Sequence, residues 1–339
     1  MAPGREQAYA VSLEDVQAAA ARIAPFAHRT PVMTCSAIDK AAGFSIFFKC
    51  EQFQKGGAFK FRGACNAVQA LSEEQRRCGV VTHSSGNHAL SLALAAQLAD
   101  IPAYIVVPSN TPQVKQDAVA GYAGLVELCE PSMDAREAGA AAVQARTGAT
   151  FVSPYNNAAV MAGQGTLALE LLEQAGELDA IFVPISGGGL SSGIATAAKA
   201  LQPGIKIILA EPRGWNDAAD VAASKAEGRL RMDLPKPATI ADGLQGRMGD
   251  LTWPVIRDRT DAVIAVTETE IVAAMQLIYE RMKVVVEPSG AVGLAAALSP
   301  RLAPTLGPDV RLRRVAVVLS GGNVDFGARG FWRAWLPPE

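Results

Sequence analysis

Lys60 is the residue in this chain whose position best suits covalent chemistry. It lies in the segment Gly56-Gly57-Ala58-Phe59-Lys60-Phe61-Arg62-Gly63-Ala64, between a strand-like run over Ser45–Phe53 and a helical pattern over Phe61–Leu71. An amine forms a Schiff base only when it is unprotonated, so a reactive lysine should be desolvated at an element end where glycines allow close approach. A solvated surface lysine is the alternative interpretation, because lysine is seldom buried.

Three further polar or glycine-rich segments follow strand-like runs. They are Ser84-Ser85-Gly86-Asn87-His88, Ser186-Gly187-Gly188-Gly189-Leu190 and Ser320-Gly321-Gly322-Asn323. The triple glycine precedes a helical run over Ser191–Leu201, so its N–H groups and the helix start suit a phosphate dianion. A flexible turn is the alternative. The segment matches neither the P-loop nor the dinucleotide-binding glycine pattern, which argues against an ATPase or a nicotinamide enzyme.

The composition favours a globular protein that acts on a small molecule. The chain has 339 residues, half of them hydrophobic, and a formal net charge of −2, so no electrostatic footprint for nucleic acid or an anionic membrane is expected. The beginning of the chain lacks the apolar core of a secretory signal, and no run is apolar and long enough for a membrane helix, which predicts a soluble, cytoplasmic protein. The five cysteines show no C-x-x-C spacing, so neither a disulfide framework nor a zinc site is expected.

Short apolar runs alternate with longer helical patterns from residue 45 onward, which predicts mostly parallel sheets flanked by helices. Helix starts are expected at Thr111-Pro112 and at the capping box Thr267–Glu270, which leads into a helix over Ile271–Met282. Residues Arg213–Leu234 read as a loop-rich excursion. The expected strands are Ser45–Phe53, Gly79–His83, Ala103–Val107, Leu125–Cys129, Thr150–Val152, Ala180–Ile185, Ile205–Ala210, Asp261–Val266 and Val315–Leu319.

Taken together and in this order, the lysine segment and the three other segments resemble the fold-type II pyridoxal-phosphate enzymes, and among them the serine/threonine dehydratase family. The resemblance extends from about residue 11 to residue 326. It implies an α/β fold like that of the tryptophan synthase β-subunit, with two lobes that each carry a mostly parallel sheet flanked by helices. Residues 1–78 and 154–339 would form the large cofactor-binding domain, and residues 79–153 a small inserted α/β domain. A homodimer is also implied.

The resemblance implies a role for each segment. Lys60 would hold pyridoxal 5′-phosphate and take the α-proton of an amino-acid substrate, and Ser85 would serve the opposite face. Ser320 would meet the pyridine nitrogen, where a hydroxyl leaves the ring a weaker electron sink than a carboxylate would. The residues that would bind the cofactor are Phe59, Lys60, Asn87, Ser186, Gly187, Gly188, Gly189, Leu190, Gly243, Glu287 and Ser320. Those that would receive the substrate carboxylate are Ser84, Ser85, Gly86, Asn87 and His88.

Several of these positions leave alternatives open. Ser85 could bind only the substrate carboxylate, as in a pure dehydratase. His88 could act as a general base by residue type. In the family, however, the backbone and Asn87 carry the function of this loop. Ser186 replaces the first of the four glycines usual in the family, and Tyr155 stands where animal members carry an asparagine, so substrate preference and nucleotide response stay open.

Two further groups of residues are candidates for regulation. Glu211 and Asp217 offer hard oxygen ligands, and the resemblance implies that they bind magnesium, calcium or manganese together with the backbone carbonyl of Trp215. Solvated loop acids are the alternative interpretation. The resemblance also implies that Arg281 and Lys283 are candidate ligands of an ATP effector at a dimer interface.

The activity implied by the resemblance is racemisation of serine together with β-elimination to pyruvate and ammonia. A catabolic serine/threonine dehydratase without racemisation is the first alternative, and hydroxyaspartate ammonia-lyase or aspartate racemase are others, because a fold does not fix a substrate. A biosynthetic threonine dehydratase is disfavoured, since the sequence ends at Glu339 without room for a regulatory domain. A non-catalytic protein that binds a nucleotide or amino acid is the alternative of a different class.

Overall fold

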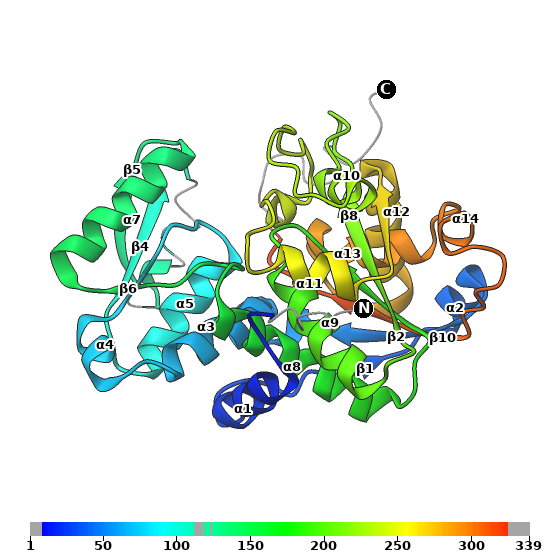
Figure 1. Cartoon of the computed structure of the whole chain (residues 1–339), viewed down its shortest axis with the longest axis horizontal. Helices are drawn as coiled ribbons and strands as arrows, with labels where there is room; N and C mark the ends of the chain where they lie inside the picture. Colours follow the sequence, from blue (N-terminus) through cyan, green and yellow to red (C-terminus); the bar gives the residue numbers. More distant parts are fainter. Residues whose placement is uncertain (1–8, 112–116, 118, 123, 325–339) are drawn as a thin grey trace, which may run out of the picture.

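Two separate β-sheets organise the molecule. The computed structural model describes residues 9–324 except 112–116, 118 and 123. Within these residues, the larger sheet has six strands in the order β1-β2-β10-β7-β8-β9, and the smaller sheet has four in the order β5-β4-β3-β6. Figure 1 shows the smaller sheet and its helices as one lobe beside the larger one.

The larger sheet is parallel except for its edge strand β1, which pairs antiparallel with β2. Its central strands β10, β7 and β8 are buried on both faces. In β10, for example, Val317 packs into one apolar cluster, and Ala316 and Val318 pack into another. This explains their continuous apolar sequences. The strands are β1 Val32–Met33, β2 Ser45–Cys50, β10 Arg314–Leu319, β7 Ala180–Pro184, β8 Lys206–Pro212 and β9 Ala262–Val266.

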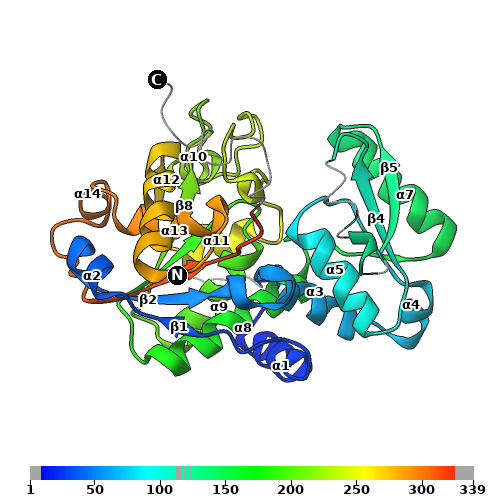
Figure 2. The ribbon, with the colours of Figure 1, turned by 180° about the vertical axis from the view of Figure 1, so that it is seen from behind.

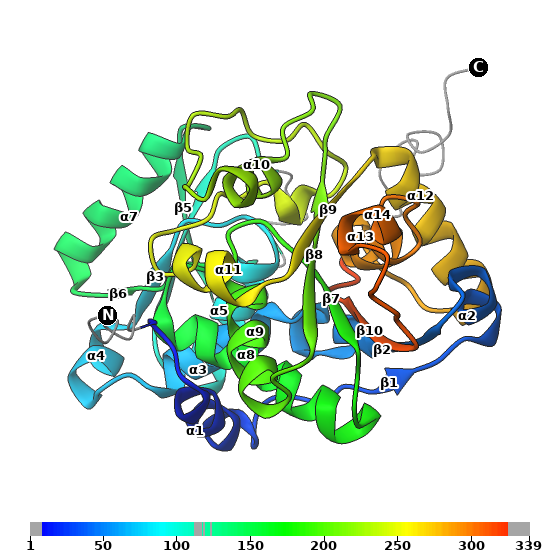
Figure 3. The ribbon, with the colours of Figure 1, turned by 45° about the vertical axis from the view of Figure 1, so that its right-hand side comes forward.

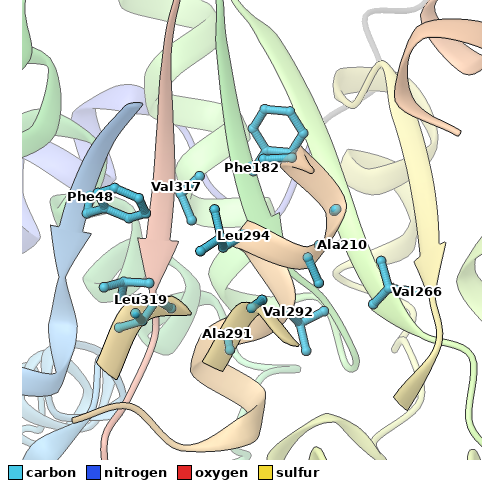
Figure 4. Close-up of a cluster of buried hydrophobic side chains, with 14 of the residues drawn as sticks. Phe48, Phe182, Ala210, Val266, Ala291, Val292, Leu294, Val317 and Leu319 are labelled. Atoms are coloured by element: carbon cyan, nitrogen blue, oxygen red, sulfur yellow. The ribbon is translucent and has the colours of Figure 1, made fainter. Parts of the chain in front are cut away.

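Helices cover both faces of the larger sheet, as Figure 3 shows. Figure 4 shows the cluster on one face, where Phe48, Phe182 and Val317 of the strands meet Leu294 of α13. The helices of this face are α2 Ser36–Ala42, α12 Glu268–Leu277, α13 Pro288–Ala297 and α14 Leu302–Leu306. Those that pack into the cluster on the other face are α1 Leu13–Ile23, α8 Ala158–Ala175, α9 Gly189–Leu201, α10 Asp220–Glu227 and α11 Trp253–Arg259.

The smaller sheet is wholly parallel. Its strands are β3 Val80–Thr82, β4 Ala103–Pro108, β5 Leu125–Cys129 and β6 Thr150–Phe151, and its neighbouring helices are α3 Lys60–Gln69, α4 Glu73–Cys78, α5 Asn87–Leu98 and α7 Met133–Thr147. Figure 2 shows this lobe from behind. One apolar cluster joins Phe61 and Val68 of α3 to Leu92 of α5 and Ile105 of β4, so α3 packs against the smaller lobe. The domain limits at residues 79 and 153 stay a prediction.

The parallel α/β class predicted from the sequence is confirmed, with corrections at several element ends. Strand β2 ends at Cys50, not at Phe53, because residues Glu51–Phe53 form a short 3₁₀ turn. The side chain of Glu51 lies in the interior, where it pairs with Arg62 of α3. The helix predicted over Ile271–Met282 begins earlier, at Glu268, within the expected capping box and directly after its N-cap Thr267, and its last turn is a π-helix. Irregular helical turns are η1 Glu51–Phe53, η2 Lys55–Gly57, η3 Asp242–Leu244 and η4 Ile278–Met282.

Three other sequence predictions meet the structure as follows. The five cysteines are free. In the part of the chain that the structure describes, no helix is both long and apolar enough to cross a membrane. The helix start expected at Pro112 lies outside the described residues, and the segment Arg213–Leu234 contains the short helix α10 within its loops.

Candidate active site

Lys60 begins helix α3, and the segment before it pairs with the segment that carries Ser320. The N–H of Phe59 donates a hydrogen bond of 3.0 Å to the carbonyl oxygen of Ser320, and Ala58 forms an isolated antiparallel bridge with Gly321. The backbone after β2 is thereby fixed against the end of β10, which is its neighbour in the sheet. Two of the four predicted segments therefore meet through main-chain hydrogen bonds.

The amine of Lys60 is held in an environment that favours its neutral form. Its Nζ donates to the carbonyl oxygen of Pro154 at 2.8 Å and lies 5.0 Å from the centre of the Phe59 ring. Burial lowers the pKa of Lys60 to about 8, while the carboxylate of Glu287 acts in the opposite direction. An amine with this pKa is partly unprotonated near neutral pH, as a Schiff-base lysine must be.

Asn87 connects the start of α5 to two segments of the larger lobe. Its Nδ2 donates to Glu287 Oε1 at 2.8 Å, and its Oδ1 accepts from Asn323 Nδ2 at 2.9 Å. The Asn323 amide also donates to the carbonyl oxygen of Gly56 at 2.7 Å. A Cβ on Gly321 would lie 2.5 Å from Glu287 Oε1, which explains the glycine there. The lysine, asparagine and Ser320 segments are thus joined in one hydrogen-bonded network.

The backbone between β7 and α9 forms a site for an anion. We call the four N–H groups of Gly187, Gly188, Gly189 and Leu190 the glycine nest. These residues are buried, and among the described residues their N–H groups donate to no protein acceptor. Unpaired buried N–H groups are costly, and a phosphate at a helix start would satisfy them. The adjacent Ser186 is half-buried.

Two side chains pack directly on the glycines of this nest. A Cβ on Gly187 would lie 2.3 Å from the ring of Tyr155, and one on Gly189 would lie 2.8 Å from the Tyr155 Cα. Gly188 has a φ of +86°, and its Cβ would lie 3.0 Å from the Cβ of Thr252. The three glycines are therefore required by close packing, and Gly188 also by its backbone conformation.

The loop between β3 and α5 carries the residues predicted to receive a carboxylate. Ser84 and Ser85 are half-buried in it, and the N–H of Gly86 donates to Ser84 Oγ at 3.4 Å. His88 is buried, with Nε2 donating to the carbonyl oxygen of Val152 at 3.0 Å, and burial lowers its pKa to about 3. His88 is therefore neutral at physiological pH and a weak base, which leaves the loop backbone and hydroxyls as the polar groups for a ligand.

Ser320 and Gly243 are linked through Ser289 near the start of α13. Ser320 is buried at the end of β10, and its Oγ lies 3.4 Å from the carbonyl oxygen of Ser289. The N–H of Gly243 donates to Ser289 Oγ at 3.1 Å. The carbonyl contact of Ser320 is long, so its hydroxyl can turn to another partner.

The predicted metal ligands have other partners. The buried carboxylate of Glu211 accepts from the N–H groups of Val221 and Ala222 at 2.8 and 2.9 Å, and its pKa is raised to about 8 by burial. Asp217 forms an ion pair with Arg213. Among the residues that the structure describes, no three acidic, histidine or cysteine side chains group together as a metal site. As arranged here, Asp217 is occupied by Arg213, and Glu211 by two backbone N–H groups.

The candidate effector residues follow helix α12. Arg281 lies in the π-helical turn, and Lys283 closes it with a φ of +60° and donates to the carbonyl oxygen of Glu280. Lys283 also lines a hollow of about 330 Å³ together with Gly57 and Asn323. The structure therefore brings Lys283 beside the lysine and Ser320 segments.

A buried ionic network supports the start of α3, and no sequence motif points to it. Arg62, two residues after Lys60, is fully buried and bonds Glu51 at 2.8 Å and Glu170 at 2.6 Å. Glu170 also pairs with the buried Lys49 at 2.7 Å. An apolar-rich segment around Arg62 could have indicated burial, but not the partners. Pro154 and Thr252 likewise contact the site without a chemical motif in the sequence.

A reactive amine at a helix start, a nest of backbone N–H groups and a buried strand-end serine define the class of enzymes that hold a phosphorylated aldehyde cofactor on a lysine. Residues 23–321 match the family model described as pyridoxal-phosphate dependent enzyme. The chain belongs to this family.

Similar proteins support this assignment over nearly the whole chain. Serine racemase from Arabidopsis thaliana is 53% identical over 329 residues, which cover 97% of each chain. The structure of maize serine racemase superposes with a TM-score of 0.91 at 51% identity, covering 96% of this chain and 97% of that chain. A structure of T.th. threonine deaminase superposes with a TM-score of 0.85 at 39% identity, covering 93% of this chain and 99% of that chain.

Proposed function

We propose that this chain interconverts L- and D-serine and also converts serine to pyruvate and ammonia. The observation that carries the proposal is the buried amine of Lys60 in a member of this family: its pKa is lowered to about 8, and it donates to the carbonyl oxygen of Pro154, whose neighbour Tyr155 packs on the glycine nest. The high identity to proteins named serine racemase supports the substrate, and the structural likeness to a threonine deaminase supports the elimination.

The residues present fit pyridoxal phosphate. The N–H groups of the glycine nest suit its phosphate, and the hydroxyl of Ser320 suits the nitrogen of its ring. Lys60 would hold its aldehyde, and Asn87 and Glu287 would border it. When bound, the cofactor supplies an electron sink that stabilises negative charge at the α-carbon of the substrate.

The remaining steps belong to protein side chains. Lys60 takes the α-proton of L-serine on one face, and Ser85 returns a proton to the same carbon from the other face, which gives D-serine. The loop from Ser84 to His88 orients the substrate carboxylate at the start of α5. Loss of the β-hydroxyl instead of reprotonation leads to pyruvate and ammonia.

The test is to incubate the cofactor-loaded protein with L-serine and to quantify D-serine by chiral chromatography and pyruvate in the same sample. Both products are expected. Ser85→Ala should lose D-serine formation and keep pyruvate formation, and Lys60→Ala should lose both. Pyruvate without D-serine from the unaltered protein would identify a serine/threonine dehydratase and contradict the role proposed for Ser85.

Other properties stay predictions from the resemblance. They are a homodimer, a cytoplasmic location, a divalent cation at Glu211, Trp215 and Asp217, and ATP as an effector at Arg281 and Lys283. The ion pair between Asp217 and Arg213 must open before Asp217 can bind a cation. The observation that favours an effector position is that Lys283 lines the same hollow as Asn323.

A further inference from the structure

We propose that Thr252 is a positioning residue for the cofactor phosphate. Its hydroxyl fixes the peptide bond between Gly187 and Gly188 so that the Gly188 N–H faces the anion. The proposal rests on the proposed function for the identity of the ligand, and it assigns a role to a side chain outside the glycine nest.

Thr252 is fully buried in the turn before α11, and its hydroxyl bonds two segments at once. Oγ1 accepts from the N–H of Gly249 at 2.9 Å and donates to the carbonyl oxygen of Gly187 at 2.9 Å. The carbonyl oxygen of Gly249, at 3.2 Å, is the more distant of the two acceptors. A hydroxyl has one proton, so with a lone pair engaged by Gly249 the proton goes to the nearer Gly187 oxygen.

This hydrogen bond determines where the next N–H points. In a trans peptide, the C=O of one residue and the N–H of the following residue point in opposite directions. Because the Gly187 oxygen is held at Thr252, the Gly188 N–H is directed away from Thr252. The next peptide is fixed in the same way, since the Gly188 oxygen accepts from the N–H of Ser192 at 2.8 Å, which directs the Gly189 N–H.

A glycine-rich loop needs such a restraint because its peptides rotate easily. Gly188 already has a φ of +86°, a conformation open to glycine at little cost. Without the Thr252 hydroxyl, the Gly187 carbonyl oxygen could turn toward the nest and face the phosphate, where two negative oxygens repel. Thr252 therefore fixes the orientation of the peptide between Gly187 and Gly188 before the ligand binds, which reduces the entropic cost of ordering the glycine nest on binding.

The experiment compares three ligands on cofactor-free, full-length protein: pyridoxal phosphate, pyridoxal, which lacks the phosphate, and inorganic phosphate. Equilibrium dissociation constants are measured for the unaltered protein, Thr252→Val, Thr252→Ser and the control Thr260→Val. Thr260 is a matched control because it is also a buried threonine, at the other end of α11, and its hydroxyl donates to the carbonyl oxygen of Ile256 at 2.6 Å. Thermal unfolding of each variant verifies that it is folded.

Thr252→Val should raise the dissociation constants for pyridoxal phosphate and inorganic phosphate about tenfold, the effect of one lost hydrogen bond. The dissociation constant for pyridoxal should change by less than about twofold. Thr252→Ser keeps the hydroxyl and should stay within about threefold of the unaltered protein, and Thr260→Val should change none of the constants. The proposal would be overturned if Thr252→Val weakened the binding of pyridoxal and of pyridoxal phosphate equally, or weakened neither. If Thr252→Val does not fold, Thr252→Ala removes the hydroxyl without placing a methyl against the carbonyl and is judged by the same outcomes.

The same samples separate this proposal from the proposed function. An unaltered protein that binds phosphate ligands through Thr252 but forms neither D-serine nor pyruvate would refute the function and leave the role of Thr252 intact. An unaltered protein that forms both products while Thr252→Val binds pyridoxal phosphate normally would refute only the role of Thr252. Failure of the unaltered protein to bind pyridoxal phosphate or inorganic phosphate would refute both.

Discussion

The carboxylate of Glu287 and the burial of Lys60 act on the same amine in opposite directions: burial lowers its pKa to about 8, and the carboxylate raises it. Glu287 is itself buried and accepts a hydrogen bond from Asn87. The proton affinity of Lys60 is therefore a balance between desolvation and one nearby charge.

The first prediction concerns the pH dependence of cofactor attachment. The pKa of Lys60 lies below its ordinary value of 10.5, so the reactive, unprotonated fraction rises with pH and levels off above about 8. Below that pH, the rate at which cofactor-free protein binds pyridoxal phosphate covalently should fall about tenfold per pH unit. Stopped-flow absorbance measures this rate. A midpoint near the ordinary lysine pKa would contradict the burial of the amine, and Lys60→Ala supplies the background rate.

The second prediction follows from the charge of Glu287. Glu287→Gln removes the carboxylate that raises the pKa of Lys60 but keeps an oxygen that can accept from Asn87. The midpoint of the same pH profile should therefore move below about 8. A matched variant, Glu280→Gln, removes an exposed carboxylate that is not among the groups that shift the pKa of Lys60, and it should leave the midpoint unchanged. An upward shift in Glu287→Gln would show that the two groups are not coupled as described.

The third prediction uses the contact between Gly187 and Tyr155. Gly187→Ala would place a Cβ 2.3 Å from the tyrosine ring, so the nest must deform. The dissociation constant for pyridoxal phosphate should rise about tenfold or more, because overpacking costs of order 1–3 kcal/mol.

Gly246→Ala is the control for that experiment, since its Cβ would meet the same ring at an ordinary distance of 3.5 Å. The double variant Gly187→Ala with Tyr155→Ala should recover part of the lost affinity, because the clash is removed. Equal effects of Gly187→Ala and Gly246→Ala would show that the contact with Tyr155 does not determine the shape of the nest.

The fourth prediction concerns the buried ionic network. Arg62→Ala leaves the fully buried carboxylate of Glu51 without its ionic partner, and the free energy of unfolding should fall by about 3–5 kcal/mol in urea titrations. Arg29→Ala removes an ion pair with Glu173 in which both side chains are largely exposed, and should have little effect. Comparable losses in the two variants would contradict the distinction between buried and exposed pairs.

The sequence predicted the parallel α/β class because buried parallel strands leave a signal in single segments: each is a short continuous apolar run next to a helical pattern. It also placed Lys60 at the start of a helix and the triple glycine between a strand and a helix, since glycine and capping residues mark such boundaries. The sequence did not predict that β2 ends before Glu51, because Glu51 leaves the strand to pair with Arg62, which lies in the following helix α3.

Contacts between segments far apart in the chain could not be predicted from residue types. The oxygen of Pro154 that accepts from Lys60 is a backbone atom and carries no sequence signal. Thr252 precedes a proline-containing helix start and resembles an ordinary capping threonine, although its hydroxyl bonds Gly187 instead of its own helix. The two acids predicted to bind a metal looked alike in the sequence, yet Glu211 is buried and Asp217 is exposed.

The position of β10 has a consequence for the order in which the protein can form. It is the last of the described strands along the chain, yet it lies between β2 and β7 in the middle of the larger sheet. During synthesis, β2 therefore cannot complete its pairing with β10 until residue 319 has been made. The bridge between Ala58, two residues before Lys60, and Gly321 closes at the same late stage. A growing chain cannot assemble a competent site early, and until β10 is made the edges of β2 and β7 that it will join are unpaired and open to pairing with other chains.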